Sequence, residues 1–453
     1  MVFFILSAVF IIVSFLAVGI IAGKQRKTAD FSLGGRQINI PGVVGILMGS
    51  VVGGASTVGT VEMAYRYGAV ACWFTVGAGC ACLLLGLKLA APLRLSGCAT
   101  ISEYMGKEYG VATTYATTIV SSLGTFLSMT AQFLASIALL KGIFAISTVC
   151  AALSVGSLVL GFIIVGGIQS FSAVGKIKIF LLYAVLILCV LAALYQGYTP
   201  TLLAVKLPFS PWFNPFSKGI LPSVSSFLSL IVGVFSTQIY IQAIFSAKNA
   251  RTARTGALVS AFLIPPLGFL SIWVGLAVRA SGVEIPPGEA FSWFILHSFP
   301  NGIGGGLWAV FLMTTIASTA GLALGITTNV TNDLLQPFLR IIHSGQVKTF
   351  LNRGILVFLI GLSSILSIYS ADSTILSWSY LSMGLRGGGS VIPFLFALKK
   401  PGLIPPRFGL ASVLAGLAGV LCAPLLHLDP LFLSLTISAG IVLTGIFFSS
   451  RQK

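Results

Sequence analysis

The feature that most constrains this chain is a series of apolar segments that continues from one end of the sequence to the other. A membrane-spanning helix needs about 20 apolar residues, and lipid tolerates only backbones whose hydrogen bonds are closed within helices or barrels. About thirteen segments meet this requirement, and they lie near residues 2–23, 40–65, 69–92, 112–143, 144–166, 170–197, 223–246, 256–281, 304–336, 349–370, 373–398, 407–427 and 429–449. The sequence therefore predicts an all-α polytopic membrane protein, in which residues 1–453 form a single membrane domain.

Composition and charge agree with a membrane location. Only 8% of the 453 residues are charged, whereas soluble domains carry roughly a quarter. The net charge of +17 comes from basic residues in short loops between the apolar segments, so we expect no nucleic-acid partner. If the N-terminus lies outside, 18 of the 26 lysines and arginines fall in cytoplasmic loops and five in external loops. This distribution follows the positive-inside rule and predicts an N-out, C-in orientation.

Residues that commonly build enzyme or metal sites are sparse. The seven cysteines form no CxxC pair, and most lie within apolar segments, where cysteine behaves as a small hydrophobic residue. The sequence contains no HExxH, GxGxxG or GxSxG motif. We therefore expect no enzyme activity, no cofactor and no disulfide framework.

The second apolar segment, residues 40–65, is unusually rich in glycine. It holds six glycines together with the hydroxyl residues Ser50, Ser56 and Thr57. Each interior glycine costs about 1 kcal/mol of helix propensity. Small residues of this kind allow helices to pack closely; alternatively, the helix is broken and its unwound carbonyls line a site near the membrane midplane. The residues alone leave both interpretations open.

The ninth segment carries a row of hydroxyl side chains, in the stretch FLMTTIASTAGLALGITTNVTNDLL. Thr315, Ser318 and Thr319 are spaced i, i+3, i+4, so they share one face of a helix. Hydroxyl and carbonyl oxygens suit a hard cation such as sodium, and secondary transporters hold such ions at broken helices. The competing interpretation is that these hydroxyls bond to carbonyls one turn earlier in their own helix.

Ionisable residues inside spans are costly and are functional candidates by default. Arg386 lies deep in the eleventh segment, where its planar fork suits a carboxylate; alternatively, it bonds to helix-end carbonyls that the neighbouring glycines expose. Glu62 and Arg66 stand four residues apart, which predicts an interfacial ion pair. Asp333 is expected to end the ninth span at the cytoplasmic face.

Six stretches carry a family resemblance. They read FSLGGRQIN, GTVEMAYRYG, PLRLSGCATISEYMGKEYG, GGIQSFSAVGKIKIFLLY, QIYIQAIFSAKNARTA and TTIASTAGLALGITTNVTNDLL. In these stretches the chain resembles the sodium:solute symporter family, and together they span nearly the whole sequence. The resemblance implies the five-plus-five inverted-repeat fold of bacterial amino-acid transporters, with broken second and seventh spans. The expected parts are an extra N-terminal helix and loop (1–39), a first repeat (40–198), a second repeat (220–398) and two C-terminal helices (405–453).

The resemblance also implies a sodium site and a neighbouring substrate site. Sodium would be held by the backbone carbonyls of Gly49, Val52 and Thr315 and by the hydroxyls of Ser318 and Thr319. The substrate would bind between the broken parts of the second and seventh spans. Its candidate contacts are Ser56, Thr57, Trp73, Thr75, Thr237, Gln238 and Gln242. Arg386 is added as a further candidate because it lies deep inside a span.

The sixth span departs from the family pattern. An aspartate is usual about eight residues after a Gly-Gly pair, but Gly166-Gly167 leads here to Gly175 and then to Lys176 and Lys178. Lys178 shares the face of Gly175, whereas Lys176 points about 100° away and is expected to snorkel to the cytoplasm. Either both lysines snorkel, or one ammonium takes the place of the sodium ion.

These features predict a secondary active transporter that works by alternating access in a bacterial-type cytoplasmic membrane. We expect sodium-coupled symport of a small polar organic solute, and basic residues inside the spans favour a carboxylate. The alternative is a proton-coupled or uncoupled carrier in which Lys178 or Lys176 replaces the sodium ion. A channel is more remote, because the sequence has no repeated filter loop or charged ring. The expected partners are the small-molecule substrate and the lipid bilayer, with no obligate protein partner evident.

Overall fold

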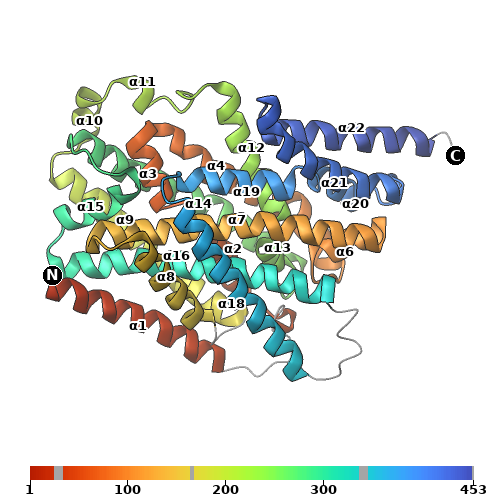
Figure 1. Cartoon of the computed structure of the whole chain (residues 1–453), viewed down its shortest axis with the longest axis horizontal. Helices are drawn as coiled ribbons and strands as arrows, with labels where there is room; N and C mark the ends of the chain where they lie inside the picture. The colour runs from red at the N-terminus through yellow and green to blue at the C-terminus, as the bar shows by residue number, and fades with distance from the viewer. Residues whose placement is uncertain (25–33, 164–167, 336–344, 451–453) are drawn as a thin grey trace.

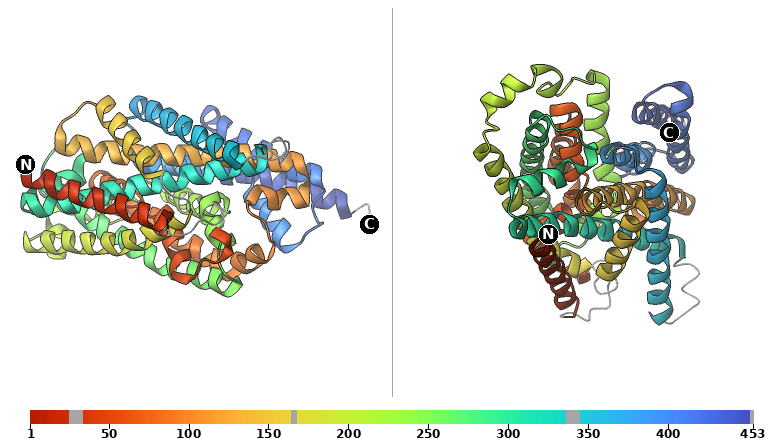
Figure 2. Two further views of the ribbon diagram at one scale, coloured as in Figure 1. Left: turned by 90° about the horizontal axis from the view of Figure 1, so that it is seen from below. Right: turned by 60° about the vertical axis from the view of Figure 1, so that its left-hand side comes forward.

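The computed structural model describes residues 1–24, 34–163, 168–335 and 345–450. The expected Gly166-Gly167 pair lies outside these ranges. Within them the chain is helical apart from its turns, and the isolated bridge between Ile38 and Ala247 is the one β contact. Figures 1 and 2 show helices packed side by side along the long axis, with the two termini at opposite ends. The predicted all-α bundle is confirmed.

The helices in the first part of the chain are α1 (Val2–Lys24), α2 (Ile40–Val51), α3 (Val58–Tyr67), α4 (Cys72–Leu84), α5 (Ala90–Leu95), α6 (Ile101–Tyr109), α7 (Val111–Phe144), α8 (Thr148–Ile163) and α9 (Ile168–Tyr195). Those that follow are α10 (Pro200–Lys206), α11 (Phe209–Trp212), α12 (Ile220–Ser236), α13 (Gln238–Phe245), α14 (Ala250–Ala280), η4 (Pro287–Glu289), α15 (Ala290–Ser298), α16 (Asn301–Asn329), η5 (Val330–Leu335), α18 (Gly345–Tyr369), α19 (Ile375–Gly387), α20 (Val391–Lys399), α21 (Pro406–Cys422) and α22 (Pro430–Ser450).

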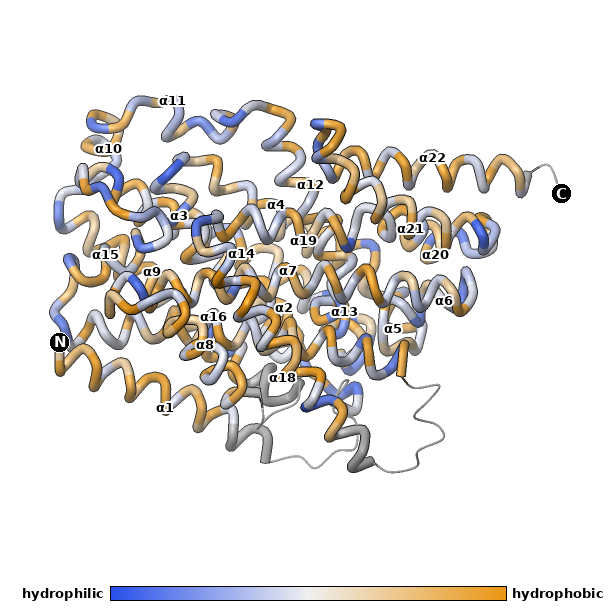
Figure 3. Tube along the Cα trace, viewed as in Figure 1, coloured by the Kyte–Doolittle hydropathy of each residue, from blue (hydrophilic) through white to orange (hydrophobic). Residues whose placement is uncertain are grey.

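The helices suit a membrane. Among the described residues, nine helical stretches are long and apolar enough to cross one, or up to eleven if each bent pair counts as one span. Figure 3 shows hydrophobic residues along the helices and hydrophilic residues gathered in the turns between them. α2 and α8 have 12 and 16 residues, which is shorter than a full span. A membrane location is supported, while the count of thirteen spans, the orientation and the two inverted repeats stay predictions.

Three helical segments are interrupted within the bundle. α2 ends where Val52 leaves helical geometry (φ −88°, ψ 92°), and α3 begins after Thr57. Thr237, with φ −95° and ψ 115°, separates α12 from α13, which are bent by 50°. These interruptions lie in the second and seventh segments, where breaks were predicted. A third bend of 49°, between α19 and α20 at Gly388 and Gly389, was not predicted.

α2 and α9 are in direct backbone contact at two glycines. A Cβ atom on Gly175 would overlap the carbonyl oxygen of Gly45, so a larger residue cannot fit unless a helix moves. The aspartate that the family pattern places near Gly175 therefore has no room in this packing. Gly49 lies one turn after Gly45, and Lys178 lies nearly one turn after Gly175, so the contact brings Gly49 and Lys178 together.

The variant Gly175→Ala should destabilise the bundle by about 1–3 kcal/mol, because the added methyl group overpacks the α2–α9 contact. Gly361→Ala in α18 is the matched control, since a Cβ atom there meets nothing within 4 Å. This control should be neutral or stabilising, by up to about 1 kcal/mol of helix propensity. Thermal melting of both purified variants in detergent makes the comparison. A Gly175→Ala protein that melts at or above the wild-type temperature would contradict this packing.

Candidate functional site

The break between α2 and α3 is stabilised by side chains that bond to its free backbone groups. Ser56 Oγ accepts the N–H of Gly53 (2.9 Å) and donates to the Gly53 carbonyl (3.1 Å). Thr57 Oγ1 donates to the same carbonyl (2.7 Å), and Gln132 Oε1 on α7 accepts the N–H of Gly54 (2.6 Å). Unpaired backbone groups would be costly in a membrane interior, so these bonds make the unwound segment tolerable. Ser56 and Thr57, expected as substrate contacts, thus bond to the break itself.

A cluster of oxygens lies where α2 meets α16. Ser318 Oγ is 3.0 Å from the carbonyl oxygen of Gly49 and 3.5 Å from that of Val52. The ammonium of Lys178 enters this cluster from α9 and donates to Gly49 O (2.7 Å) and to Ser318 Oγ (2.6 Å). We call these three oxygens, from Gly49, Val52 and Ser318, the cation cluster. The cation that contacts this cluster is therefore a side chain of the protein, the Lys178 ammonium.

The two threonines of the predicted sodium site bond within their own helix. Thr319 Oγ1 donates to the carbonyl of Thr315 (2.9 Å), one turn earlier in α16. Thr315 Oγ1 donates to the carbonyl of Leu312 (2.7 Å) and accepts a hydrogen bond from Ser136 on α7 (2.6 Å). Two of the five predicted ligands, Gly49 O and Ser318 Oγ, therefore bond to the Lys178 ammonium, and a third, Val52 O, lies 3.5 Å from Ser318 Oγ. The other two belong to α16, where they bond to each other.

The two lysines of α9 have opposite environments. Lys178 has no exposed surface, whereas Lys176 is exposed. The difference follows from the 100° turn per residue of a helix, which directs Lys178 toward α2 and Lys176 away from it. A buried charge is tolerated only when it is paired or hydrogen-bonded, and Lys178 meets that condition through the cation cluster.

Arg386 is a second fully buried cation. Its Nη1 donates to Ser128 Oγ on α7 (3.1 Å) and to Ser382 Oγ on α19 (2.8 Å). Among the described residues, its Nε and Nη2 have no hydrogen-bond partner. The bonds to hydroxyls differ from the helix-end carbonyls that the alternative interpretation expected, and they leave the N–H groups of Nε and Nη2 free for a ligand.

Three further substrate candidates lie on α4 and α13. Trp73 donates its indole N–H to the carbonyl of Pro215 (2.7 Å), in the loop before α12. Thr75 is packed against α14, where a Cβ atom on Gly268 would overlap it. Gln242 is buried on α13. Trp73 therefore bonds to the loop before α12, and Thr75 is buried against α14.

The side chains at the α12–α13 bend form hydrogen bonds with backbone groups of neighbouring segments. Thr237 Oγ1 donates to the carbonyl of Gly233 (2.5 Å), which caps the end of α12. Gln238 donates to the carbonyl of Ala99 (2.9 Å) and accepts the N–H of Ile101 (3.2 Å). Gln238 therefore ties α13 to the start of α6.

The carboxylate of Asp333 is buried at the same end of the bundle. Asp333 is only 8% exposed, and its two oxygens accept hydrogen bonds from Thr100 Oγ1 (2.8 Å) and Thr118 Oγ1 (3.0 Å). Arg94 donates to the carbonyl of Ala247 nearby. Asp333 lies two residues before the end of the helical stretch Asn301–Leu335, where hydroxyls from two other elements donate to its carboxylate, and its place at the cytoplasmic face stays a prediction. The loop charges predict that this end is cytoplasmic.

The expected ion pair between Glu62 and Arg66 is not formed. Over the residues that the structure describes, the one side-chain ion pair joins Lys107 and Glu103 (3.4 Å). Glu62 Oε2 instead accepts the backbone N–H of Ile375 (3.1 Å), the first residue of α19. Helix N-termini present unbonded N–H groups with partial positive charge, so this carboxylate stabilises the start of α19.

Comparison with known sequences points to one family. A sequence model of the sodium:solute symporter family matches residues 31–399. The uncharacterized symporter YwcA of Bacillus subtilis (strain 168) is 25% identical over 277 residues, which cover 57% of this chain and 52% of that protein. High-affinity choline transporter 1 of Caenorhabditis elegans is 27% identical over 274 residues, covering 56% of this chain and 46% of the transporter. The chain spans about half the length of the curated relatives it matches.

Solved structures share the fold. A Na⁺-coupled sialic acid symporter in a substrate-bound, outward-open state superposes with a TM-score of 0.80 at 15% identity, covering 99% of this chain and 98% of that one. A nucleobase-cation-symport-1 family transporter in a closed conformation gives a TM-score of 0.62 at 13% identity, covering 92% and 93%. The family match extends over most of the sequence. The chain belongs to the sodium:solute symporter family, a family of membrane transporters and not of enzymes.

Proposed function

We propose that this chain is a secondary active transporter that carries a small polar organic solute across a membrane by alternating access. Family membership supports sodium-coupled symport, and the broken helices supply the unwound backbone that such transporters use for binding. One observation carries the proposal. The Lys178 ammonium bonds to Gly49 and Ser318, which are two of the groups expected to bind the coupling ion.

The geometry favours Lys178 as a built-in cation. Its ammonium carries the charge of a sodium ion and meets the same oxygens. A sodium ion 4 Å from that ammonium would be repelled by about 4 kcal/mol at an effective dielectric constant of 20, so the two cations exclude each other. If the bundle rearranges so that the oxygens of the cation cluster move away while Lys178 stays buried, the ammonium loses its partners, and burial then favours the neutral amine and release of the proton. In this version, protonation and deprotonation of Lys178 drive transport.

Sodium coupling is the second candidate, because family membership favours it. In this version sodium enters the cation cluster after Lys178 has withdrawn or released its proton. The ligands would then be the carbonyls of Gly49, Val52 and Thr315 and the hydroxyls of Ser318 and Thr319. The two versions differ in which gradient drives uptake.

We propose that the solute carries a carboxylate. Arg386 is fully buried and forms no ion pair among the described residues, and two of its three nitrogens, Nε and Nη2, have no hydrogen-bond partner there. A guanidinium presents donors in a fixed fork that matches the two oxygens of a carboxylate. Ser128, which bonds to Arg386, lies one turn along α7 from Gln132, which bonds to the helix break. A small solute at the break is therefore close enough to reach Arg386.

The variant Lys178→Met should abolish acid-driven uptake, because the side chain keeps its bulk but can no longer carry a proton. Uptake is measured in proteoliposomes under separate pH and sodium gradients, with a solute found by a tracer screen of small carboxylates, amino acids and sugars. Lys176→Met, which changes an exposed lysine on the same helix, should leave uptake unaltered. Sodium-driven uptake that survives Lys178→Met unchanged would reject the built-in cation and leave sodium symport as the function.

Ser318→Ala should raise the concentration of the driving cation that gives half-maximal uptake by about 5–100-fold, because one polar ligand contributes about 1–3 kcal/mol. Thr328→Ala is the matched control on the same helix, since its hydroxyl bonds to the carbonyl of Leu324 and belongs to neither version of the ion site. Its effect should be much smaller in the same uptake titration. Equal effects of both substitutions would remove Ser318 from its assigned role.

Arg386→Lys should weaken solute binding about 10–100-fold while the protein still folds, because lysine keeps the charge but loses the forked pair of donors. Binding is followed by displacement of a radiolabelled solute from purified protein. Arg251→Lys, a change at an exposed arginine, should have no effect. Transport of neutral solutes alone, with no carboxylate recognised, would contradict the substrate assignment.

A further inference from the structure

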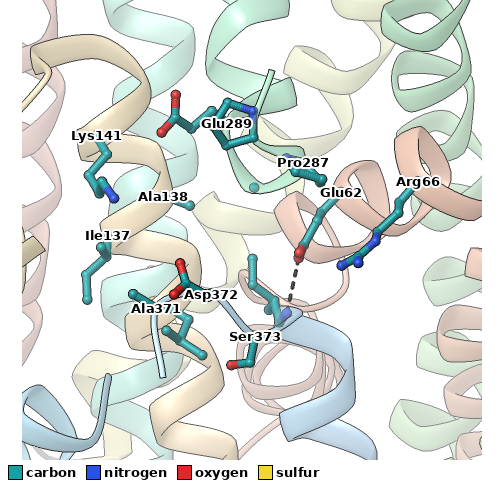
Figure 4. Close-up of a pocket in the computed structure, with 14 residues that line it drawn as sticks. Glu62, Arg66, Ile137, Ala138, Lys141, Pro287, Glu289, Ala371, Asp372 and Ser373 are labelled. Carbon is teal, nitrogen blue, oxygen red and sulfur yellow. Dashed lines mark hydrogen bonds between the residues drawn. The ribbon is translucent and has the colours of Figure 1, made fainter. Parts of the chain in front are cut away.

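A separate cavity of about 260 Å³ lies at the end of the bundle opposite the bonds of Asp333. It is lined by α3, α7, η4 and the residues that lead into α19. Figure 4 shows Lys141 and Asp372 on one side of this cavity, and Glu62 and Arg66 on the other. Together with Glu289 from η4, these side chains place three carboxylates and two cations around one space.

The five charges do not neutralise one another. None of them forms an ion pair within 4.0 Å, since the one such pair in the described ranges joins Lys107 and Glu103, at the other end of the bundle. Glu62 bonds to a backbone N–H, and Arg66 stacks on the ring of Tyr67. Opposite charges that share a cavity without pairing leave room for a solute that carries both charges.

The position of the cavity places it directly before the helix break. Its lining includes Leu134, two residues along α7 from Gln132, whose side chain bonds to the break. Below it, a Cβ atom on Gly59 would lie 2.9 Å from Cγ2 of Ile375, so α3 and α19 are in direct contact. The bond from Ile375 to Glu62 spans the same contact. A solute that moves from the cavity toward the break along this contact has to separate α3 from α19.

We propose that this cavity is a reception site that binds a zwitterionic solute before it reaches the central site. The carboxylates of Glu62, Glu289 and Asp372 suit an ammonium group, while Arg66 and Lys141 suit a carboxylate. A solute with a single charge would meet like charges as well as opposite ones. The volume lies near the lower limit of ligand pockets, about 300 Å³, which fits a solute of amino-acid size. This inference rests on the proposed transport function and narrows its substrate class to zwitterions.

The test uses cysteine protection in the full-length protein. Ala138, a half-buried residue of the cavity lining, is changed to cysteine after the exposed Cys150 and Cys422 have been replaced by serine. The rate of labelling by an uncharged maleimide is measured in purified protein, with the parent lacking Ala138→Cys as background. Alanine and glycine betaine are the zwitterionic probes, and propionate and propylamine are the singly charged controls.

We expect at least one zwitterion to slow labelling saturably, with an affinity about fivefold or more above that of either singly charged control. Glu289→Gln and Lys141→Gln should each weaken that protection by a similar factor. Glu284→Gln, an exposed glutamate of the same loop that does not line the cavity, should retain it. Equal protection by all four probes, or protection by neither zwitterion, overturns the reception site.

The same assay separates this inference from the proposed function. Lys178→Met and Arg386→Lys alter the central site, so they should reduce uptake while protection of the cysteine at position 138 persists. Protection that disappears in either variant would mean that the zwitterion binds in the central site, and it would overturn a separate reception site. Normal uptake in these variants would contradict the roles proposed for Lys178 and Arg386 and leave the protection result unaffected.

Discussion

The close approach of α2 and α9 at Gly45 and Gly175 is the contact on which the site depends. Without side chains at these positions, the two helices lie backbone to backbone. One turn further along, the same approach places the Lys178 ammonium against the carbonyl of Gly49 and the hydroxyl of Ser318. A bulkier residue at position 175 would separate the helices and remove the partners of a buried charge, whose isolation in a membrane interior is costly.

The broken helix and the buried charge support each other. An interrupted helix exposes backbone groups that lipid cannot satisfy. Here Gln132 from α7 accepts the N–H of Gly54, Ser56 accepts the N–H of Gly53, and Thr57 donates to the carbonyl of Gly53. The carbonyl of Gly49, near the end of α2, receives the ammonium. Polar groups that would each destabilise the bundle are therefore paired, and a rearrangement that breaks one pairing exposes the others. This mutual dependence is a physical basis for coupling ion and solute movements.

Much of the architecture could be predicted from sequence, because apolar segment length and glycine content report directly on spans and breaks. Helical periodicity predicted that Lys178 and Lys176 point in different directions, but it left open whether Lys178 is buried, and the structure shows that it is. The side chains that complete the site were harder to predict. Gln132 is a single amide in the apolar helix α7, and its role depends on the three-dimensional position of Gly54. Trp73 was assigned to the substrate by resemblance, but the loop at Pro215 provides its partner.

The central claim is that the Lys178 ammonium occupies the oxygens that would otherwise bind sodium. Calorimetric titration of purified wild-type protein and Lys178→Met with sodium chloride, against choline chloride at equal ionic strength, tests it most directly. If the claim holds, removing the ammonium frees the oxygens of Gly49 and Ser318, and Lys178→Met binds sodium more tightly than the wild type. Sodium binding to the wild type with equal or higher affinity would contradict the account.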